Sequence, residues 1–141
     1  MNDMDRKEIR NENPMTHILI IDDSPTEVHV FKNMLMNHDI EVSVAKNGEE
    51  GIEKAIEVMP DCILMDVVMP GKNGFQATRD LSRNPATSAI PVIIITTKDQ
   101  ETDRIWGMRQ GARDYIVKPA REKDLITRIK KVLGVDRDYQ E

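Results

Sequence analysis

The stretch "HILIIDDSP", residues 17–25, decides the fold, because an apolar run ends there in two adjacent carboxylates. Continuous rather than alternating apolar residues are typical of a strand that is buried on both faces. Two neighbouring negative charges repel each other and gain nothing from an apolar core. Asp22 and Asp23 therefore indicate either the start of a helix or an ion-binding site, and the rest of the sequence chooses between these two interpretations.

Short apolar runs recur along the chain and predict further strands. Strands are expected over residues 17–21, 41–45, 62–65, 92–95 and 115–117. The segments between them have helical spacing, and predict helices that begin at Pro25 and Gly48 and that cover 74–83, 99–110 and 121–133. Five strand–helix repeats predict an α/β fold with a five-stranded parallel sheet, helices on both faces and the flavodoxin-like strand order 2-1-3-4-5.

Residues at the helix ends support these boundaries. Ser24 to Glu27 matches a capping box, with Pro25 at the first helical position. Asp99 is expected to cap the helix over 99–110, and Gly111 to end it. We expect apolar residues of the helix that begins at Gly48 to face the core, namely Ile52, Ala55 and Ile56. Trp106 is interpreted as core-facing rather than as a partner anchor.

Composition limits the classes of function. A chain of 141 residues with 39% hydrophobic and 32% charged residues predicts a single globular domain, over residues 16–134, flanked by loose tails over 1–15 and 135–141. The net charge of −5 and the absence of a basic run argue against nucleic-acid and membrane partners. No apolar stretch reaches the ~20 residues of a membrane span. A single cysteine, Cys62, favours the cytoplasm.

Carboxylates follow two strands that the predicted order makes neighbours. Asp22 and Asp23 follow the first strand, and Asp66 follows the third. Two unit charges 4 Å apart repel by about 4 kcal/mol at an effective dielectric constant of 20. Such a cluster requires a shared cation, and hard oxygen ligands with open positions suit Mg²⁺. Capping alone does not explain two acids, since Ser24 already fills the cap position.

Two further polar side chains belong to the same edge of the sheet. Thr96 ends the fourth strand and Lys118 follows the fifth. A metal, a lysine and a hydroxyl around one carboxylate describe a phosphoryl acceptor, in which Asp66, Thr96 and Lys118 carry the chemistry. We assign Asp66 as the acceptor because it stands alone before the loop "VVMPGKNG", residues 67–74, whose turns can leave it facing the crevice.

Four motifs, "IDDSP", "LMDVVMPGKNGF", "VIIITT" and "GARDYIVKP", resemble the receiver domains of two-component response regulators, the CheY-like family. The resemblance covers residues 17 to about 134. It implies that a histidine kinase phosphorylates Asp66, and that Lys118 binds the phosphoryl group. It also implies a switch pair, Thr96 with Tyr115, and a cis bond between Lys118 and Pro119.

The resemblance extends the predicted metal site. It implies that Mg²⁺ is bound by Asp22, Asp23 and Asp66 together with the backbone carbonyl of Val68. Val68 and Lys98 also mark departures, since the best-known chemotaxis receiver has a polar amide and an acid at these positions. Both flank the path of the hydrolytic water in the family, so the lifetime of a phosphoryl group here does not follow from the resemblance.

The sequence looks similar in particular to PilH-type regulators of type IV pilus twitching motility. We therefore expect a stand-alone switch that controls twitching or chemotaxis-like signalling. Its downstream protein target would bind the face formed by the helix over 99–110, the strand over 115–117 and the helix over 121–133. In this expectation Tyr115 rotates inward after Thr96 moves towards the phosphoryl group.

Other functions stay open at this point. One is a receiver-like module that takes no phosphate, and another is a phosphate sink. A third is an aspartyl-phosphate phosphatase of the haloacid dehalogenase type, although that family places its acids two apart as "DxD". A fourth is an FMN-binding flavodoxin, although "DDSPTE", residues 22–27, offers acids where a phosphate would bind.

Overall fold

The computed structural model describes residues 15–134, and its centre is one parallel sheet. The strands are β1 (His17–Ile21), β2 (Glu41–Ala45), β3 (Cys62–Met65), β4 (Val92–Thr96) and β5 (Asp114–Val117). They lie in the order β2-β1-β3-β4-β5, which confirms the predicted fold class and strand order. The tails expected over 1–15 and 135–141 lie outside the described residues, except for Met15.

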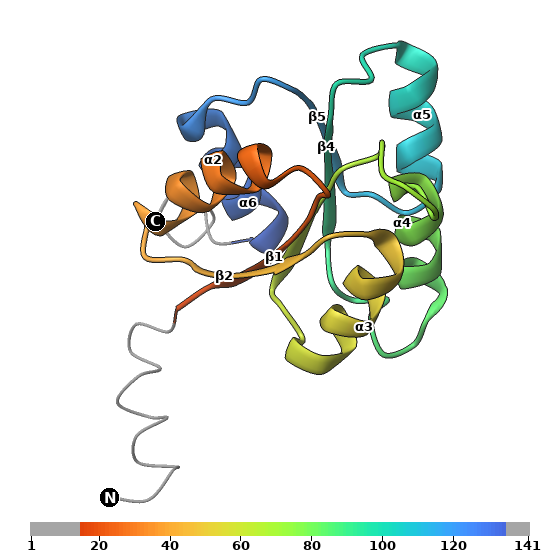
Figure 1. Cartoon of the computed structure of the whole chain (residues 1–141), viewed down its shortest axis with the longest axis horizontal. Helices are drawn as coiled ribbons and strands as arrows, with labels where there is room; N and C mark the ends of the chain where they lie inside the picture. The colour runs from red at the N-terminus through yellow and green to blue at the C-terminus, as the bar shows by residue number, and fades with distance from the viewer. Residues whose placement is uncertain (1–14, 135–141) are drawn as a thin grey trace, which may run out of the picture.

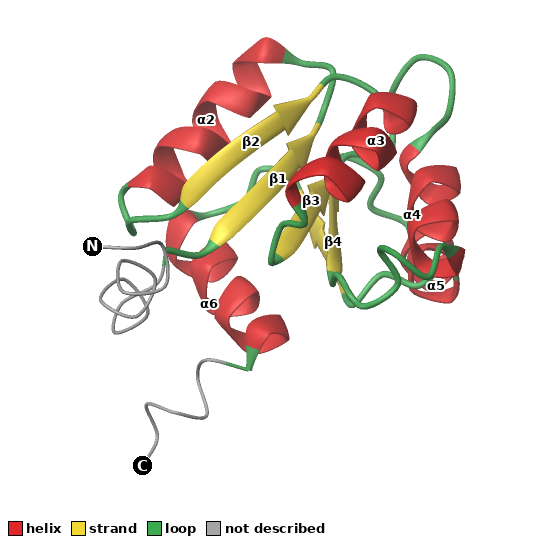
Figure 2. Cartoon of the chain, turned by 90° about the horizontal axis from the view of Figure 1, so that it is seen from below, coloured by secondary structure: helices red, strands yellow, loops and turns green. Residues whose placement is uncertain are grey.

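Helices cover both faces of the sheet, as expected for right-handed crossovers between parallel strands. Figures 1 and 2 show α2 (Pro25–Met36) and α6 (Glu122–Leu133) on one face, and α3 (Gly48–Val58), α4 (Gly74–Arg83) and α5 (Glu101–Arg109) on the other. None of the helices in residues 15–134 is long and apolar enough to cross a membrane.

The sheet separates two apolar clusters, which explains the continuous apolar runs. In β1, Leu19 and Ile21 pack towards α3, α4 and α5, whereas Ile18 and Ile20 pack towards α2 and α6. Both sets are removed from water, since each of these four residues is at most 1% exposed. Cys62 is also buried in this sheet, and burial raises the pKa of its thiol to about 12, so it is an inert packing residue.

Some local predictions were wrong. Ile56 is 45% exposed and Trp106 is 49% exposed, so neither belongs to the core. Gln100 rather than Asp99 occupies the cap position of α5, which begins at Glu101. Glu27 completes only half of a capping box, because its amide donates to Ser24 Oγ at 3.3 Å while its carboxylate lies elsewhere.

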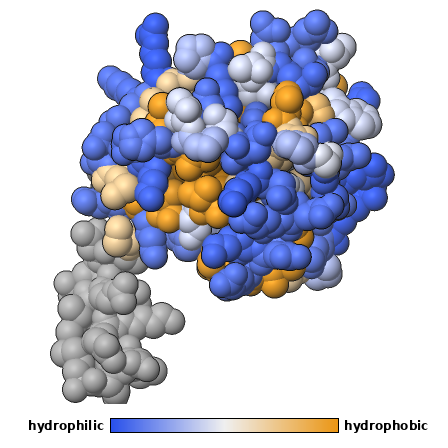
Figure 3. All heavy atoms as spheres, in the orientation of Figure 1, coloured by the Kyte–Doolittle hydropathy of each residue, from blue (hydrophilic) through white to orange (hydrophobic). Residues whose placement is uncertain are grey.

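Exposed apolar residues lie on a mainly polar surface. Figure 3 shows one face of the molecule, on which hydrophilic residues predominate and apolar residues form separate patches. Trp106 and Ile105 on α5 are among the large apolar residues that remain exposed, together with Val117 on β5. They belong to the surface expected to bind the downstream partner.

Gly74, the first residue of α4, permits a close approach that places the loop after β3. A Cβ atom there would lie 2.7 Å from Val67 Cα and 2.8 Å from the carbonyl carbon of Asp66. Such distances are well inside van der Waals contact, and backbone atoms cannot rotate away. The absence of a side chain at Gly74 therefore allows α4 to pack directly against the residues that follow β3.

We predict that Gly74→Ala destabilises the fold and displaces Asp66. The added methyl group forces the backbone of residues 66–67 to shift, and overpacking of this kind costs about 1–3 kcal/mol. Urea unfolding measures the loss, with the exposed α2 variant Lys32→Ala as the control that stays within about 0.5 kcal/mol of wild type. Equal stability of the Gly74→Ala variant and wild type would show that the loop yields without strain.

Candidate functional site

Three carboxylates meet where β1 and β3 end. Ile21 and Met65 are paired in the sheet, so the next residues, Asp22 and Asp66, leave neighbouring strands at the same level. Ligand oxygens of Asp22, Asp23 and Asp66 all lie within 4.8 Å of one another. Asp22 and Asp66 are buried, whereas Asp23 is exposed. A cluster of hard oxygen atoms with one open side fits the chemistry of Mg²⁺, which keeps part of its water shell.

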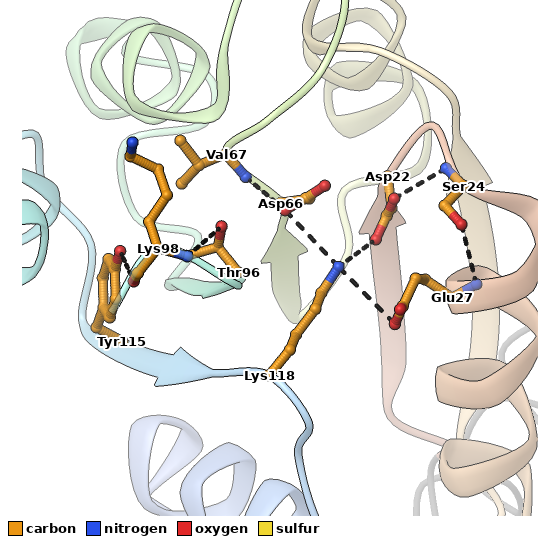
Figure 4. Close-up of polar contacts among 9 residues, drawn as sticks. All are labelled: Asp22, Ser24, Glu27, Asp66, Val67, Thr96, Lys98, Tyr115 and Lys118. Carbon is orange, nitrogen blue, oxygen red and sulfur yellow. Dashed lines mark hydrogen bonds and ion pairs between the residues drawn. The ribbon is translucent and has the colours of Figure 1, made fainter. Parts of the chain in front are cut away.

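Lys118 supplies the positive charge of this site. Its ammonium group lies 3.1 Å from Asp22 Oδ2, 3.7 Å from Asp66 Oδ1 and 3.8 Å from Glu27 Oε2 (Figure 4). The side chain is only 9% exposed and lies 5.7 Å from the centre of the Phe31 ring. One lysine against the carboxylates of Asp22, Glu27 and Asp66 leaves the site with an excess of negative charge.

Backbone donors orient the two buried carboxylates. The amide of Val67 donates to Asp66 Oδ1 at 2.8 Å, and the amide of Ser24 donates to Asp22 Oδ1 at 2.9 Å. The hydrogen bond and the ion pair of Asp66 thus both involve Oδ1. No buried side-chain oxygen in residues 15–134 lacks a hydrogen-bond partner, so Oδ2 of Asp66 reaches solvent. Oδ1 of Asp66 is therefore held by Val67 and Lys118, whereas Oδ2 is open to an incoming group.

The environment of Asp66 favours its neutral form. Burial raises the pKa of the carboxyl above its ordinary value, and the charges of Asp22 and Asp23 add to this effect. Lys118 and the amide of Val67 oppose it. The balance remains towards a raised pKa. In the absence of a further cation, the ionised form of Asp66 therefore costs folding free energy.

Thr96 and Tyr115 are both linked to the backbone of Lys98 (Figure 4). The amide of Lys98 donates to Thr96 Oγ1 at 3.4 Å, and the Tyr115 hydroxyl donates to the Lys98 carbonyl at 2.8 Å. Burial, with Asp103 and Asp99 as lesser causes, raises the pKa of Tyr115 to about 12. Tyr115 is only 6% exposed, so its ring lies inside the protein in this structure, and its rotation in a switch remains a prediction.

Glu27 and Phe31 are site residues that the sequence interpretation missed. Glu27 was assigned to a capping box, but the amide of Ser24 donates to Asp22 instead, and the Glu27 carboxylate faces Lys118. Their spacing of four residues places both on one side of α2, which is the signal that could have found them. The Lys118–Pro119 bond is cis, as the resemblance implies. The side chain of Val68 is 61% exposed, and the role of its carbonyl as a metal ligand remains a prediction.

Comparison with known proteins agrees with this geometry. Residues 18–130 match the model of the response regulator receiver domain. The chain belongs to the receiver domain family of response regulators. This membership excludes the haloacid dehalogenase and flavodoxin alternatives, and makes the chain a signalling domain rather than an enzyme that turns over a separate substrate.

Two relatives match this chain over almost their whole length. Protein PilH of Pseudomonas aeruginosa is 57% identical over 120 residues, which cover 85% of this chain and 99% of PilH. The chemotaxis protein CheY4 of Vibrio cholerae has a similar structure, with a TM-score of 0.79 and 27% identity over 84% of this chain and 98% of CheY4.

One related structure was solved with a metal ion. The receiver domain of the sensor histidine kinase PA1611 from Pseudomonas aeruginosa contains a magnesium ion coordinated in its active site cleft. It aligns with a TM-score of 0.79 and 27% identity, covering 85% of this chain and 98% of that domain. The acidic site of this chain is typical of a receiver pocket that binds magnesium.

We predict that Asp66→Asn stabilises the metal-free protein at neutral pH. A carboxyl with a raised pKa binds more protons in the folded than in the unfolded chain, so its contribution to stability falls as pH rises above its ordinary pKa of 3.8. An amide avoids this loss, and we expect a gain on the order of 1 kcal/mol at pH 7 that shrinks towards pH 4.

Urea unfolding in the presence of a chelator measures this gain. Asp39→Asn serves as the control, because Asp39 is exposed and its positive φ of 58° is one that asparagine tolerates. A gain that is independent of pH, or absent at pH 7, would contradict the electrostatic origin.

Proposed function

We propose that this receiver accepts a phosphoryl group on Asp66 from a histidine kinase, with Mg²⁺ bound by Asp22, Asp23 and Asp66. The observation that carries the proposal is the convergence of these three carboxylates with Lys118 at one edge of the sheet. The backbone carbonyl of Val68 is proposed as a further ligand. When bound, the metal would neutralise charge on the transferring group.

The residues of the chain suggest how the transfer would proceed. The solvent-facing Oδ2 of Asp66 attacks the phosphorus atom of a phosphohistidine, an O–P bond forms and the N–P bond breaks. The electron pair of the broken bond stays on the histidine nitrogen, and the ring leaves as a neutral imidazole because its other nitrogen carries a proton in the phosphohistidine. Lys118, 3.7 Å from Asp66 Oδ1, would turn towards the phosphoryl oxygens, and the Thr96 hydroxyl would donate to one of them.

The switch would then act through Lys98. When Thr96 donates to a phosphoryl oxygen, its hydroxyl moves away from the Lys98 amide, and Tyr115 is bonded to the carbonyl of the same residue. Phosphorylation would thus favour one arrangement of Lys98 and Tyr115 from a pre-existing equilibrium. The face formed by α5, β5 and α6 carries the exposed Trp106 and Val117, and is proposed to bind the downstream protein.

The relatives support a proposal for the biological setting. Similarity to PilH over nearly its whole length supports a stand-alone cytoplasmic regulator of type IV pilus twitching motility, or of related chemotaxis-like signalling. A phosphate sink, which competes for the phosphoryl groups of the kinase, uses the same site. The two roles differ in whether the phosphorylated form binds a target.

Phosphotransfer tests the proposed chemistry directly. A radiolabelled kinase is expected to label wild type in Mg²⁺, and labelling of Asp66→Ala is expected to fall at least about 100-fold, because the attacking oxygen is lost. Asp39→Asn is the matched control and should accept phosphate normally. A chelator should abolish transfer to wild type. Labelling of Asp66→Ala at the wild-type rate would overturn the assignment of the acceptor.

Magnesium binding is predicted to stabilise the fold. At about 100 times its dissociation constant, Mg²⁺ should add about 2.7 kcal/mol to the free energy of unfolding. Replacing the exposed ligand Asp23 by asparagine should remove most of this gain without disturbing the core, whereas Asp39→Asn should keep it. Thermal unfolding with and without Mg²⁺ measures the difference. An equal shift in wild type and Asp23→Asn would exclude Asp23 as a ligand.

A further inference from the structure

A cationic groove between α4 and α5 has no role in phosphoryl transfer. It encloses about 340 Å³ and is lined by residues of both helices and of the turn after α5, namely Arg79, Ser82, Arg83, Trp106, Arg109, Gln110 and Gly111. No acidic residue lines it. Its three arginines are exposed, and none of them forms an ion pair or side-chain hydrogen bond with another residue in the range 15–134.

Helix dipoles explain only part of this groove. Arg83 and Arg109 lie in the last turns of their helices, where positive charge is favourable. That effect accounts neither for Arg79 nor for Trp106, which lines the same groove and is 49% exposed. Arginine and tryptophan are the residues that most often dominate protein interfaces. In a chain of net charge −5, an unpaired cationic groove with an aromatic side chain fits an acidic, partly apolar partner surface.

Helix α3 offers such a surface on the same chain. Glu49, Glu53 and Glu57 recur every four residues and are all exposed. Ile56 lies beside this stripe and is 45% exposed, and Met59, just beyond the helix, is 54% exposed. The stripe therefore combines negative charge with apolar surface, which complements the groove.

The position of α4 makes the two surfaces self-complementary. Helices α3, α4 and α5 form one layer on the sheet, with α4 in contact with both neighbours (Figures 1 and 2). Because all strands are parallel, the three helices run in the same direction, and their C-terminal halves lie at the same end. Gly48 at the start of α3 lies against Ala77 of α4, so Glu53 on α3 is at about the level of Arg83 on α4. A two-fold axis parallel to α4 would bring each stripe onto the groove of the other copy.

We propose that this receiver self-associates through its α3–α4–α5 layer, with the glutamate stripe of α3 from each copy seated in the arginine groove of the other. The interface shares α5 and Trp106 with the face proposed for the downstream partner, but it uses α3 and α4 in place of β5 and α6. It also lies away from Asp66, so the test does not depend on phosphorylation. The contacts are charged and exposed, so the association should be weakened by salt.

Reciprocal charge reversal tests the pairing. Wild type is expected to dimerise in sedimentation equilibrium at low salt, and to dissociate in about 0.5 M salt. The double variants Arg79→Glu/Arg83→Glu and Glu53→Arg/Glu57→Arg should each weaken self-association at least about tenfold. Mixing the two variants should restore a heterodimer, because both stripe–groove contacts are then oppositely charged. Combining all four substitutions in one chain should restore the homodimer.

Controls separate this interface from general charge effects. Arg121→Glu/Lys123→Glu changes the net charge as much as the groove variant, at exposed residues on the opposite face, and should leave the dimer intact. Circular dichroism should show that every variant is folded. The proposal is overturned if wild type is monomeric at low salt, or if the two reversed variants fail to associate with each other. A monomeric wild type that binds polyglutamate would assign the groove to an acidic segment of another protein.

Discussion

Uncompensated negative charge at the carboxyl edge of the sheet is the constraint on which the site depends. Asp22 and Asp66 are buried side by side, with Asp23 within ligand distance and Glu27 beside the only lysine of the cluster. Lys118 lies within 4 Å of three of these carboxylates and cannot neutralise all of them. A divalent cation bound as proposed would relieve the remaining repulsion, and the same cation would favour a phosphoryl group at Asp66.

The parallel sheet makes this concentration of charge possible. Each strand is fixed by apolar side chains on both faces, so the residues after β1, β3 and β5 have no freedom to move apart. The amide of Val67 and the glycine at position 74 fix Asp66 further, from the loop side. Folding free energy from two apolar clusters thus balances an electrostatic cost that is confined to one edge.

Much of this arrangement could be predicted from the sequence, because it depends on neighbours in the chain. Apolar runs gave the strands, and the residue after each run gave Asp22, Asp66, Thr96 and Lys118. Contacts between elements that lie far apart in the sequence were harder to predict. Glu27 satisfies a capping pattern, and only the position of Lys118 reveals its other role. Ile56 follows the apolar spacing of α3. That helix, however, packs against Ile21 through Gly51. At this short distance Ala55 faces the core, and Ile56 is left at the surface.

The same reasoning explains why Tyr115 and Trp106 could not be placed from local pattern. Gly107 brings the backbone of α5 so close to β5 that a Cβ atom there would lie 3.2 Å from the Tyr115 ring. The ring fills this space and bonds to Lys98, and the adjacent Trp106 is consequently directed to solvent. An outward movement of Tyr115 would remove one of the two side chains against which Gly107 packs, the other being Ile94, and would loosen the contact of α5 with the sheet. Gly107 therefore couples two features through the Tyr115 ring. One is the hydrogen bond to Lys98, and the other is the surface of α5 that carries Trp106.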